Sequence, residues 1–338
     1  MHGATGGFIL TASHNPGGPD ADFGIKFNCS NGGPAPDAFT DRIHRLTQDI
    51  VQLRTCPSLA CDFHTIGSYS FMVEGASFVV DVVDPVTDYV ALMKKVVNFE
   101  QIKTFLAETD FKLLLNSMHG ATGPYVEAIF VGELGCAASS CVKTEVLPDF
   151  GGGHPDPNLT YAADLVAAMA AGEHGLGAAF DGDGDRNMIL GKDAFFVTPC
   201  DSLAVLADNL EHIPWFQVLP PSPLSSPSLL SLPHLPILSR TEGVREWRGR
   251  CRPQEPWTVW PRPGVRRGEW RDPPPGLECF DTPTGWKYFG SLLDAGRIGL
   301  CGEESFGTGS DHVREKDGVW AALCWLQVPT PPGYTMPR

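Results

Sequence analysis

Three aspartates stand at alternate positions in the motif Asp-Gly-Asp-Gly-Asp, residues 181–185. Because glycine tolerates backbone conformations that other residues avoid, such a chain can curl until three carboxylates face one hard cation. An EF-hand loop begins in the same way but needs glycine at its sixth position and glutamate at its twelfth, where this chain has Arg186 and Lys192. Three carboxylates leave coordination places for water or phosphate, so the motif favours Mg²⁺ over a full Ca²⁺ cage. A solvated acidic turn is the alternative, but the apolar run 176–180 leads directly into the motif and argues against it.

A serine beside a histidine marks the second motif, Thr-Ala-Ser-His-Asn-Pro-Gly-Gly at residues 11–18. It follows an apolar stretch that predicts a strand, so Ser13 is expected on a loop at the end of that strand. The Gly-x-Ser-x-Gly elbow of hydrolases does not fit, because His14 adjoins the serine and Thr11 replaces the first glycine. Alone, a Ser-His pair is more typical of a turn. Beside a Mg²⁺ site it gains a chemical interpretation, since a serine that carries a phosphoryl group needs a metal and nearby donors to hold the phosphoryl oxygens.

Carboxylates and hydroxyls gather on a third, glycine-bounded stretch, Gly-Glu-Glu-Ser-Phe-Gly-Thr-Gly-Ser at residues 302–310. Such a loop suits the recognition of sugar hydroxyls, although in isolation an ordinary loop is the simpler interpretation. Cations follow at 312–318 and are close enough in sequence to hold a phosphate. Two further turns carry weaker signals, at 282–287 and 151–158, and the second is interpreted as a structural turn before a helix.

The composition bounds the class of protein. The chain has 338 residues and a formal net charge of −15, which argues against binding to a nucleic-acid backbone, since that requires a basic surface. It has no apolar run long enough to cross a membrane and no signal-like start, so no membrane partner is expected. Its 10 cysteines lack the spacing of a zinc site and are interpreted as free thiols in the cytoplasm.

The order of the expected elements indicates an α/β fold. Strands are predicted over 111–116, 141–147 and 176–180, with helices between them over 124–134 and from Asn158 to residue 171. This alternation is typical of parallel strands with helices on their faces. Ligands bind such sheets at the carboxyl ends of the strands, where the loops 117–123 and 181–186 lie. Upstream, the same patterns predict two strands and a helix, over 7–11, 24–28 and 36–51.

Residues 216–279 have a different composition, rich in proline, arginine and tryptophan and without a helical or strand period. A polyproline docking segment or a basic arm for a partner is one interpretation. A disordered or aberrant insert is the interpretation that we favour. The tail, residues 327–338, is irregular as well.

Together the motifs resemble the α-D-phosphohexomutase superfamily, and within it the cytosolic phosphoglucomutases of vertebrates. The resemblance rests on the serine motif 11–18, the aspartate motif 181–186, Thr-Gly-Trp at 284–286 and Gly-Glu-Glu-Ser-Phe-Gly at 302–307. It covers about residues 1–215 and 280–326, and four motifs in the same order make a chance match negligible.

The resemblance implies an isomerase that interconverts α-D-glucose 1-phosphate and glucose 6-phosphate through a phosphoserine enzyme and glucose 1,6-bisphosphate. It implies that Ser13 carries the phosphoryl group, that His14 helps to hold the serine loop and that Lys26 acts as acid or base. Mg²⁺ would be bound by Ser13, Asp181, Asp183 and Asp185. The sugar phosphate would be bound by Arg186, Thr284, Gly285, Glu303, Ser305 and Lys316. A cytoplasmic monomer whose partners are small sugar phosphates is expected.

Members of the superfamily have four domains around one cleft. The resemblance implies mixed sheets flanked by helices, with the fourth domain absent and the chain truncated at both ends. The expected parts are a partial first domain at 1–84, a metal-binding second domain at 85–215, the insert at 216–279, a partial third domain at 280–326 and the tail at 327–338. Two alternatives stay open, a non-catalytic cytoskeletal scaffold and an inactive truncated isoform, and phosphomannomutase is the nearest competing activity. The complete serine and aspartate motifs favour the enzyme.

Overall fold

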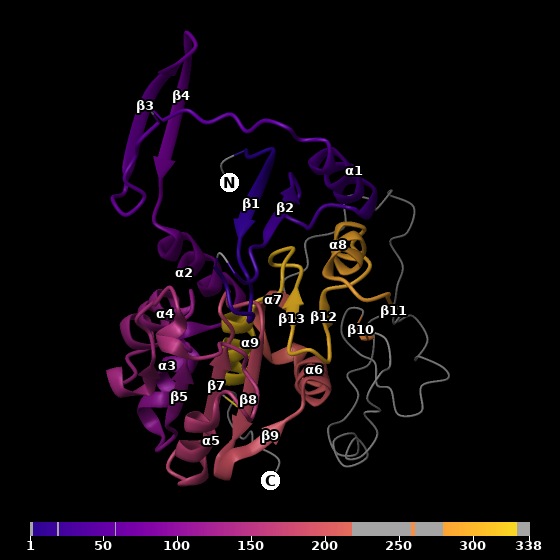
Figure 1. Cartoon of the computed structure of the whole chain (residues 1–338). Helices are drawn as coiled ribbons and strands as arrows, with labels where there is room; N and C mark the ends of the chain where they lie inside the picture. The colour runs from indigo at the N-terminus through magenta and orange to yellow at the C-terminus, as the bar shows by residue number, and fades with distance from the viewer. Residues whose placement is uncertain (1–2, 19, 58, 218–257, 261–279, 330–338) are drawn as a thin grey trace.

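A mixed five-stranded sheet forms the centre of the molecule (Figure 1). The computed structural model describes residues 3–18, 20–57, 59–217, 258–260 and 280–329. The strands run in the order β6-β5-β7-β8-β9, and the first three are parallel while β8 and β9 are antiparallel to their neighbours. Their bounds are β5 Leu113–Asn116, β6 Cys141–Val142, β7 Leu176–Phe180, β8 Asn187–Gly191 and β9 Phe195–Val197. The predicted parallel layer is therefore confirmed, and an antiparallel pair extends it.

The apolar residues of this sheet alternate between two helix-covered faces. Leu113 and Leu115 of β5 belong to one core and Leu114 to the other, as the two-residue period of a strand requires. Because both faces of the sheet are buried, these strands are continuous apolar runs in the sequence. The second core lies under α5 Ala163–Ala170. The larger core is covered by α2 Pro85–Val96, α3 Phe99–Glu108, α4 Gly123–Val126, the π-helix Glu127–Glu133 and α6 Pro199–Asp208.

One fully buried helix, α9 Gly318–Gln327, joins this sheet to the next part of the chain. All of its 10 residues are buried, and Trp320 is 0% exposed. A helix that is apolar on every side belongs in the interior, and α9 packs against β7, β8 and the strand β13 described below. Among the described residues, neither α9 nor any other helix has the length and apolar character that crossing a membrane requires.

A second, antiparallel sheet carries the C-terminal motifs. Its strands run in the order β11-β10-β12-β13, and α8 Trp286–Asp294 packs against β12 through Trp286 and Phe289 in a small core of its own. The strand bounds are β10 Thr258–Trp260, β11 Phe280–Asp281, β12 Leu300–Gly302 and β13 Thr308–Ser310.

β10 lies within residues 216–279, for which the sequence predicted neither strand nor helix. That prediction is wrong for β10, because three residues are too few to show a period and the strand forms by pairing with β11 and β12. It is also wrong at the start of the segment, where α7 Pro214–Gln217 places Phe216 in the main core. The tail was predicted to begin at residue 327, which is still part of α9. The remainder of both segments lies outside the described residues.

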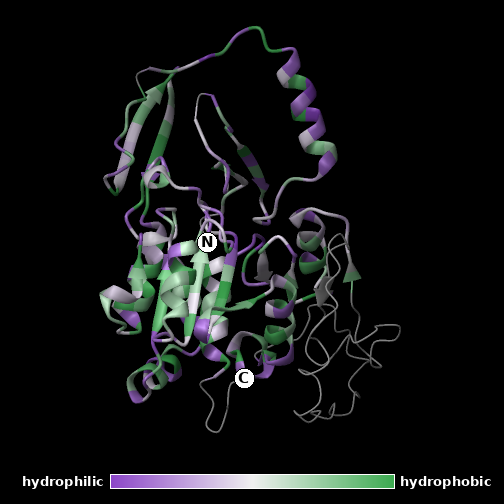
Figure 2. Ribbon diagram, turned by 60° about the horizontal axis from the view of Figure 1, so that its bottom comes forward, coloured by the Kyte–Doolittle hydropathy of each residue, from purple (hydrophilic) through white to green (hydrophobic). Residues whose placement is uncertain are grey.

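The N-terminal elements lie above the central sheet, with the hairpin β3–β4 and the helix α1 on opposite sides of the strand pair β1–β2 (Figure 1). They are an antiparallel pair, β1 Gly6–Leu10 and β2 Ile25–Cys29, the helix α1 Asp37–Gln48, and a hairpin, β3 Gly67–Val73 and β4 Ala76–Val82. The apolar stripe that predicted α1 is exposed, with Phe39 at 42%, Ile43 at 46% and Leu46 at 54%. Figure 2 shows hydrophobic and hydrophilic residues alternating along this helix. The period predicted the helix correctly. The Phe39 ring stacks on Phe27 of β2 with centroids 5.2 Å apart, but no residue of α1 is buried.

Other predicted elements differ at their ends. The strands at 111–116 and 176–180 and the helix at 124–134 are confirmed. The strand predicted over 141–147 stops at Val142, because Lys143 has a φ of +53°, which a strand cannot continue. Asn158 caps a turn before α5 rather than α5 itself. Four 3₁₀ turns complete the described elements, Ala138–Ser140, Phe150–Gly152, Lys192–Ala194 and Leu210–His212.

The central sheet should be the main source of stability. Leu115→Ala removes a side chain that is 0% exposed, so we expect the free energy of unfolding to fall by about 2–5 kcal/mol. Leu53→Ala removes the same atoms from a side chain that is 84% exposed and should change it by less than about 0.5 kcal/mol. Urea unfolding followed by circular dichroism measures both, and equal losses would contradict this placement of the core.

Candidate functional site

The aspartate motif forms the turn between β7 and β8, at the edge of the sheet where the parallel strands end. Asp181 is 0% exposed and Asp185 is 9% exposed. Gly184 permits the turn with a φ of +78°, in the left-handed region that favours glycine. The Arg186 N–H donates to Asp181 Oδ1 at 3.0 Å and closes the loop. The motif is therefore an ordered part of the fold and not a solvated turn.

The three carboxylates of this turn can share one cation. One oxygen each from Asp181, Asp183 and Asp185 lies within 4.8 Å of the other two, a separation that ligands about 2.1–2.5 Å from one ion can span. Carboxylate oxygens are the donors that hard divalent cations prefer. Elsewhere in the described part of the chain, no other group of three or more such ligands converges. The turn therefore fits a divalent metal ion.

Burial and charge shift the pKa values of these carboxyl groups in opposite directions. Burial raises the pKa of Asp181 well above its usual range, and repulsion from Asp185 and Asp183 raises it further. Burial acts on Asp183 in the same direction, but the Lys26 ammonium and a hydrogen bond from Thr11 outweigh it, so the pKa of Asp183 is lowered. A divalent cation would relieve the repulsion that these shifts express.

Ser13 reaches the aspartates from the loop that follows β1. Its hydroxyl oxygen lies 3.3 Å from Asp181 Oδ2 and 3.4 Å from Asp183 Oδ1. The residue has a φ of +56°, a left-handed conformation that is costly outside glycine and concentrates at functional sites. The two loops touch so closely that a Cβ atom at Gly182 would lie 2.4 Å from the Ser13 carbonyl oxygen. The structure thus brings together the two motifs that the sequence placed on separate elements.

Thr11 links the two loops and was not among the predicted site residues. Its hydroxyl oxygen accepts the Ser13 N–H at 2.7 Å and its hydroxyl group donates to Asp183 Oδ2 at 3.0 Å. Thr11 therefore holds the Ser13 backbone against the aspartates. The available signal was a hydroxyl two residues before the serine, but sequence alone does not reveal which residue it faces.

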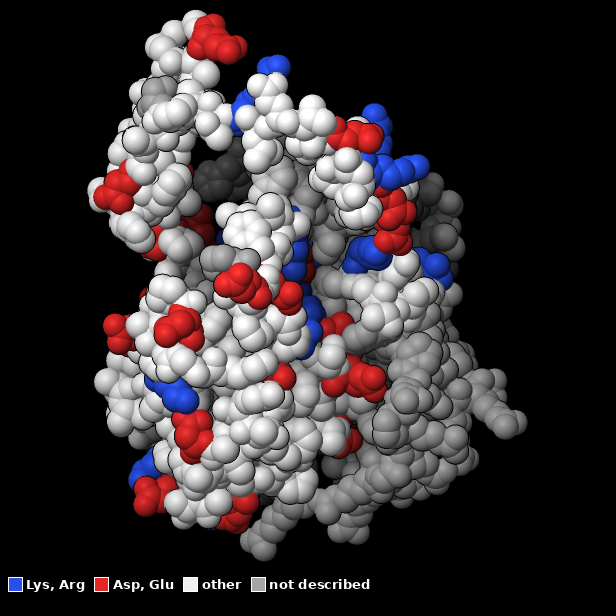
Figure 3. All heavy atoms as spheres, in the orientation of Figure 1, with Lys and Arg blue, Asp and Glu red and all other residues white. Residues whose placement is uncertain are grey.

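Two lysines flank the aspartates. Lys26 Nζ lies 3.4 Å from Asp183 Oδ2 and 3.6 Å from Asp185 Oδ2, and Lys316 Nζ lies 3.2 Å from Asp185 Oδ1. Burial lowers the pKa of each lysine, but the carboxylates outweigh it and both pKa values are raised, so both ammonium groups stay charged. Figure 3 shows basic side chains along the hollow between the N-terminal elements and the central body, with acidic side chains beside them.

His14 and Arg186 lie on another side of the serine. His14 Nδ1 is 3.5 Å from Ser13 Oγ, and Arg186 Nη1 is 3.4 Å from His14 Nε2. Burial and the Arg186 charge lower the pKa of His14, so its ring is neutral at pH 7. The His154 ring is 6.3 Å from that of His14 and stacks on Tyr161 at 4.1 Å. The turn 151–158, interpreted as structural, therefore borders the serine loop.

The loop between β12 and β13 places Glu303 and Ser305 beside Lys316. Glu303 Oε1 accepts hydrogen bonds from Lys316 Nζ at 3.1 Å and from Ser305 Oγ at 2.9 Å. Glu315, another residue that the sequence did not single out, accepts from Asn28 Nδ2 at 2.8 Å. Burial raises the pKa of Glu315 despite this hydrogen bond. These contacts join β2 to the C-terminal motifs.

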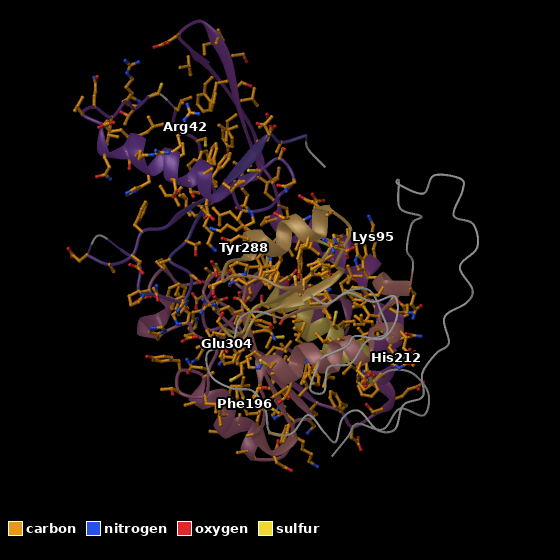
Figure 4. The ribbon with its side chains drawn as sticks, turned by 90° about the vertical axis from the view of Figure 1, so that its right-hand side faces the viewer. Arg42, Lys95, Phe196, His212, Tyr288 and Glu304 are labelled. Atoms are coloured by element: carbon orange, nitrogen blue, oxygen red, sulfur yellow. The ribbon has the colours of Figure 1, made fainter. Side chains whose placement is uncertain are left out.

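Thr284 and Gly285 are the predicted site residues that stand apart. Thr284 is exposed, and no hydrogen bond or ion pair between described residues connects it or Gly285 to the aspartates. Gly285 precedes α8 with a φ of +132°. The first turn of α8 contacts the N-terminal helix instead, since Tyr288 Oη donates to Asp37 Oδ2 at 3.2 Å. Figure 4 labels Tyr288 of α8 together with Glu304 of the β12–β13 loop. The sugar-binding roles of Thr284 and Gly285 stay predictions.

Three family models match the chain and together cover more than half of it. They describe α/β/α domains of phosphoglucomutase/phosphomannomutase, with domain I at residues 1–54, domain II at 87–194 and domain III at 275–335. The chain belongs to this family. The resemblance inferred from the four motifs is thus confirmed, as are the mixed sheets flanked by helices.

Individual members of the family are similar over nearly the whole chain. Phosphoglucomutase 1 of Drosophila melanogaster is 49% identical over 329 residues, which are 96% of this chain and 53% of that protein. Human Phosphoglucomutase-1 is 47% identical over 328 residues, 96% of this chain and 52% of that protein. Parafusin, a Paramecium phosphoprotein described as a phosphoglucomutase, has a crystal structure in an open form. It is 41% identical with a TM-score of 0.74, and the match covers 96% of this chain and 53% of that one. The chain spans about half the length of these relatives.

Metal binding should depend on each aspartate of the turn. Asp183→Asn removes one of three anionic ligands, and we expect Mg²⁺ affinity to fall about 100-fold, at the upper end of losses known for residues that support metal sites. Asp193→Asn changes an exposed aspartate in the next turn and is the matched control. Titration calorimetry measures both variants, and unchanged affinity in Asp183→Asn would rule out the metal assignment.

The buried carboxyl group of Asp181 should cost stability when no metal is added. A group whose pKa is raised in the folded protein stabilises it below the unfolded pKa and loses that contribution as pH rises through the folded pKa. Asp181→Asn removes this dependence, so in chelator the variant should have the higher Tm at pH 7. The difference should narrow as pH falls toward 4. Scanning calorimetry measures it, and a lower Tm for the variant at pH 7 would contradict the raised pKa.

Proposed function

We propose that the chain interconverts α-D-glucose 1-phosphate and glucose 6-phosphate, with Ser13 as the phosphoryl carrier, Mg²⁺ as the metal and glucose 1,6-bisphosphate as the intermediate. The observation that carries the proposal is the position of Ser13 Oγ, 3.3 Å from Asp181 and 3.4 Å from Asp183. Moving phosphate between two hydroxyls of one sugar needs a group that gives phosphate and takes it back. A serine beside a metal site does this without ATP.

Lys26 is suited to act as the acid and the base for the Ser13 oxygen. Transfer from phosphoserine to sugar forms a bond between the sugar oxygen and phosphorus and breaks the bond between Ser13 Oγ and phosphorus. The sugar hydroxyl loses its proton to solvent water, and the departing Ser13 oxygen gains one. Lys26, charged because its pKa is raised and held on the same Asp183 carboxylate as Ser13, donates that proton and recovers it when phosphate returns to the serine.

The remaining groups stabilise charge and hold the sugar. Mg²⁺ bound at Asp181, Asp183 and Asp185 would neutralise phosphoryl oxygens. Arg186 beside the serine loop and Lys316 beside Asp185 supply two cationic contacts for phosphate. Glu303 and Ser305 offer acceptor and donor groups to sugar hydroxyls, together with Thr284 and Gly285 if substrate draws α8 closer.

An enzyme explains the site better than a non-catalytic scaffold does. A scaffold has no need for a left-handed serine beside three converging carboxylates, because both features cost stability. A monomer that works on small sugar phosphates in the cytoplasm is the setting that we propose for this activity. Preference for glucose over mannose rests on the Gly-Glu-Glu-Ser loop at 302–305.

Phosphorylation of Ser13 tests the mechanism directly. Incubation of the folded chain with glucose 1,6-bisphosphate and Mg²⁺ should add one phosphate, about 80 Da, and peptide mapping should place it on Ser13. Ser13→Ala should abolish the added mass. Ser30→Ala, which changes an exposed serine after β2, should keep it. Phosphate on another residue, or none on a chain that is folded by circular dichroism and binds Mg²⁺, would contradict the proposal.

A further inference from the structure

The segment between β13 and α9, residues 311–317, is a junction of three parts of the molecule. Asn28 Nδ2 on β2 donates to Glu315 Oε1 at 2.8 Å. Lys316 Nζ lies 3.2 Å from Asp185 Oδ1 on the metal-binding turn. The position of Lys316 beside Asp185 therefore depends on the groups that fix the conformation of residues 311–317.

A buried histidine lies inside the segment. The His312 side chain is 0% exposed, and its ring stacks on Trp320 of α9 with centroids 5.2 Å apart. Its Nδ1 lies 2.6 Å from Ser310 Oγ and its Nε2 lies 3.0 Å from Asp317 Oδ2. The ring thus connects the last residue of β13 to the residue that caps α9, so it spans the two ends of the segment that carries Lys316.

Asp317 extends this connection to the helix α2. Its carboxylate accepts the Trp320 N–H at 2.9 Å and the Tyr89 hydroxyl at 2.7 Å, in addition to the His312 ring. Burial and the Asp317 charge raise the pKa of Tyr89 well above its usual range, so the phenol stays protonated and donates. The residue next to Lys316 is therefore held by groups from α2, α9 and the histidine.

Ser310, His312 and Asp317 have the residue types of a catalytic triad, but the serine is not accessible to a substrate. Ser310 is 0% exposed, so no substrate reaches its hydroxyl oxygen. Because a carboxylate only accepts hydrogen bonds, the His312 nitrogen that faces Asp317 carries the proton. The other ring nitrogen is hydrogen-bonded to the Ser310 hydroxyl, which can either donate or accept, so the set is a satisfied hydrogen-bond network rather than an activated nucleophile.

We propose that His312 is a positioning residue that holds Lys316 over the metal-binding turn. It acts through Lys316, touches neither the aspartates nor Ser13 in this structure, and is distinct from the residues that the four motifs singled out. For the effect on substrate, the inference rests on the proposed function, because Lys316 is taken to bind a phosphate of the sugar.

The amine of Lys316 reports its own position without any ligand. Its side chain is 12% exposed, whereas that of Lys94 on α2 is 45% exposed and serves as the internal reference. His312→Phe keeps a ring against Trp320 and removes both hydrogen bonds. We expect acetylation of Lys316, measured by mass spectrometry far below the unfolding temperature, to become about fivefold faster or more as the segment opens locally, with Lys94 unchanged.

Two further variants separate positioning from a general loss of stability. Ser310→Ala removes one of the two hydrogen bonds and should have a smaller effect in the same direction. His44→Phe changes an exposed histidine on α1 and should have none. Lys316 acetylation that stays at the wild-type rate in both His312→Phe and Ser310→Ala overturns the proposal.

A thermodynamic cycle tests whether the effect on substrate passes through Lys316. His312→Phe should weaken glucose 1-phosphate binding about tenfold, as loss of a supporting residue typically does. In a Lys316→Met background the same substitution should change nothing. Equal losses in both backgrounds overturn the proposal. If Lys316→Met alone leaves glucose 1-phosphate affinity unchanged, the proposed phosphate contact fails instead, and the acetylation rates still decide the positioning role.

Discussion

The concentration of three carboxylates in one buried turn is the constraint on which the rest of the site depends. Like charges at this spacing and burial raise the free energy of the folded state unless cations compensate them. The compensation comes from distant segments, since Lys26 lies on β2 and Lys316 lies just before α9. The same electrostatic attraction therefore balances the turn and holds the N-terminal strands and the second sheet against the central one.

The site divides its tasks between rigid and adaptable parts. Residues 181–185 connect two strands of a sheet that is buried on both faces, so the three carboxylates have little conformational freedom. Ser13 lies on the loop after β1, and the pair β1–β2 has much exposed apolar surface. Polar contacts hold Ser13 in place, chiefly those of the Thr11 hydroxyl. In the proposed phosphoryl transfer, this arrangement would keep the metal site fixed while the serine loop adjusts.

The sequence predicted the strands, helices and turns that are determined by short stretches of chain. The run 176–180 is apolar because its strand is buried on both faces, and the turn after it follows from alternating glycines. Thr11 and Glu315 could not be recognised, because their roles arise only when partners 172 and 287 residues away come into contact. β10 was missed because a three-residue strand owes its existence to its neighbours. The stripe of α1 predicted a helix correctly, but a period does not tell what covers the face.

The contacts of Thr11 with Asp183 and of Asn28 with Glu315 close very large loops of chain with little apolar area. Loop-closure entropy makes such contacts form late in folding, after the sheets that they connect. For the same reason they are the first to open, because breaking a few hydrogen bonds and ion pairs costs less than opening the main core. The site would then come apart under milder conditions than those that unfold the whole protein. Mild heat or dilute denaturant would disassemble the serine–aspartate pairing in a molecule whose central sheet is still intact.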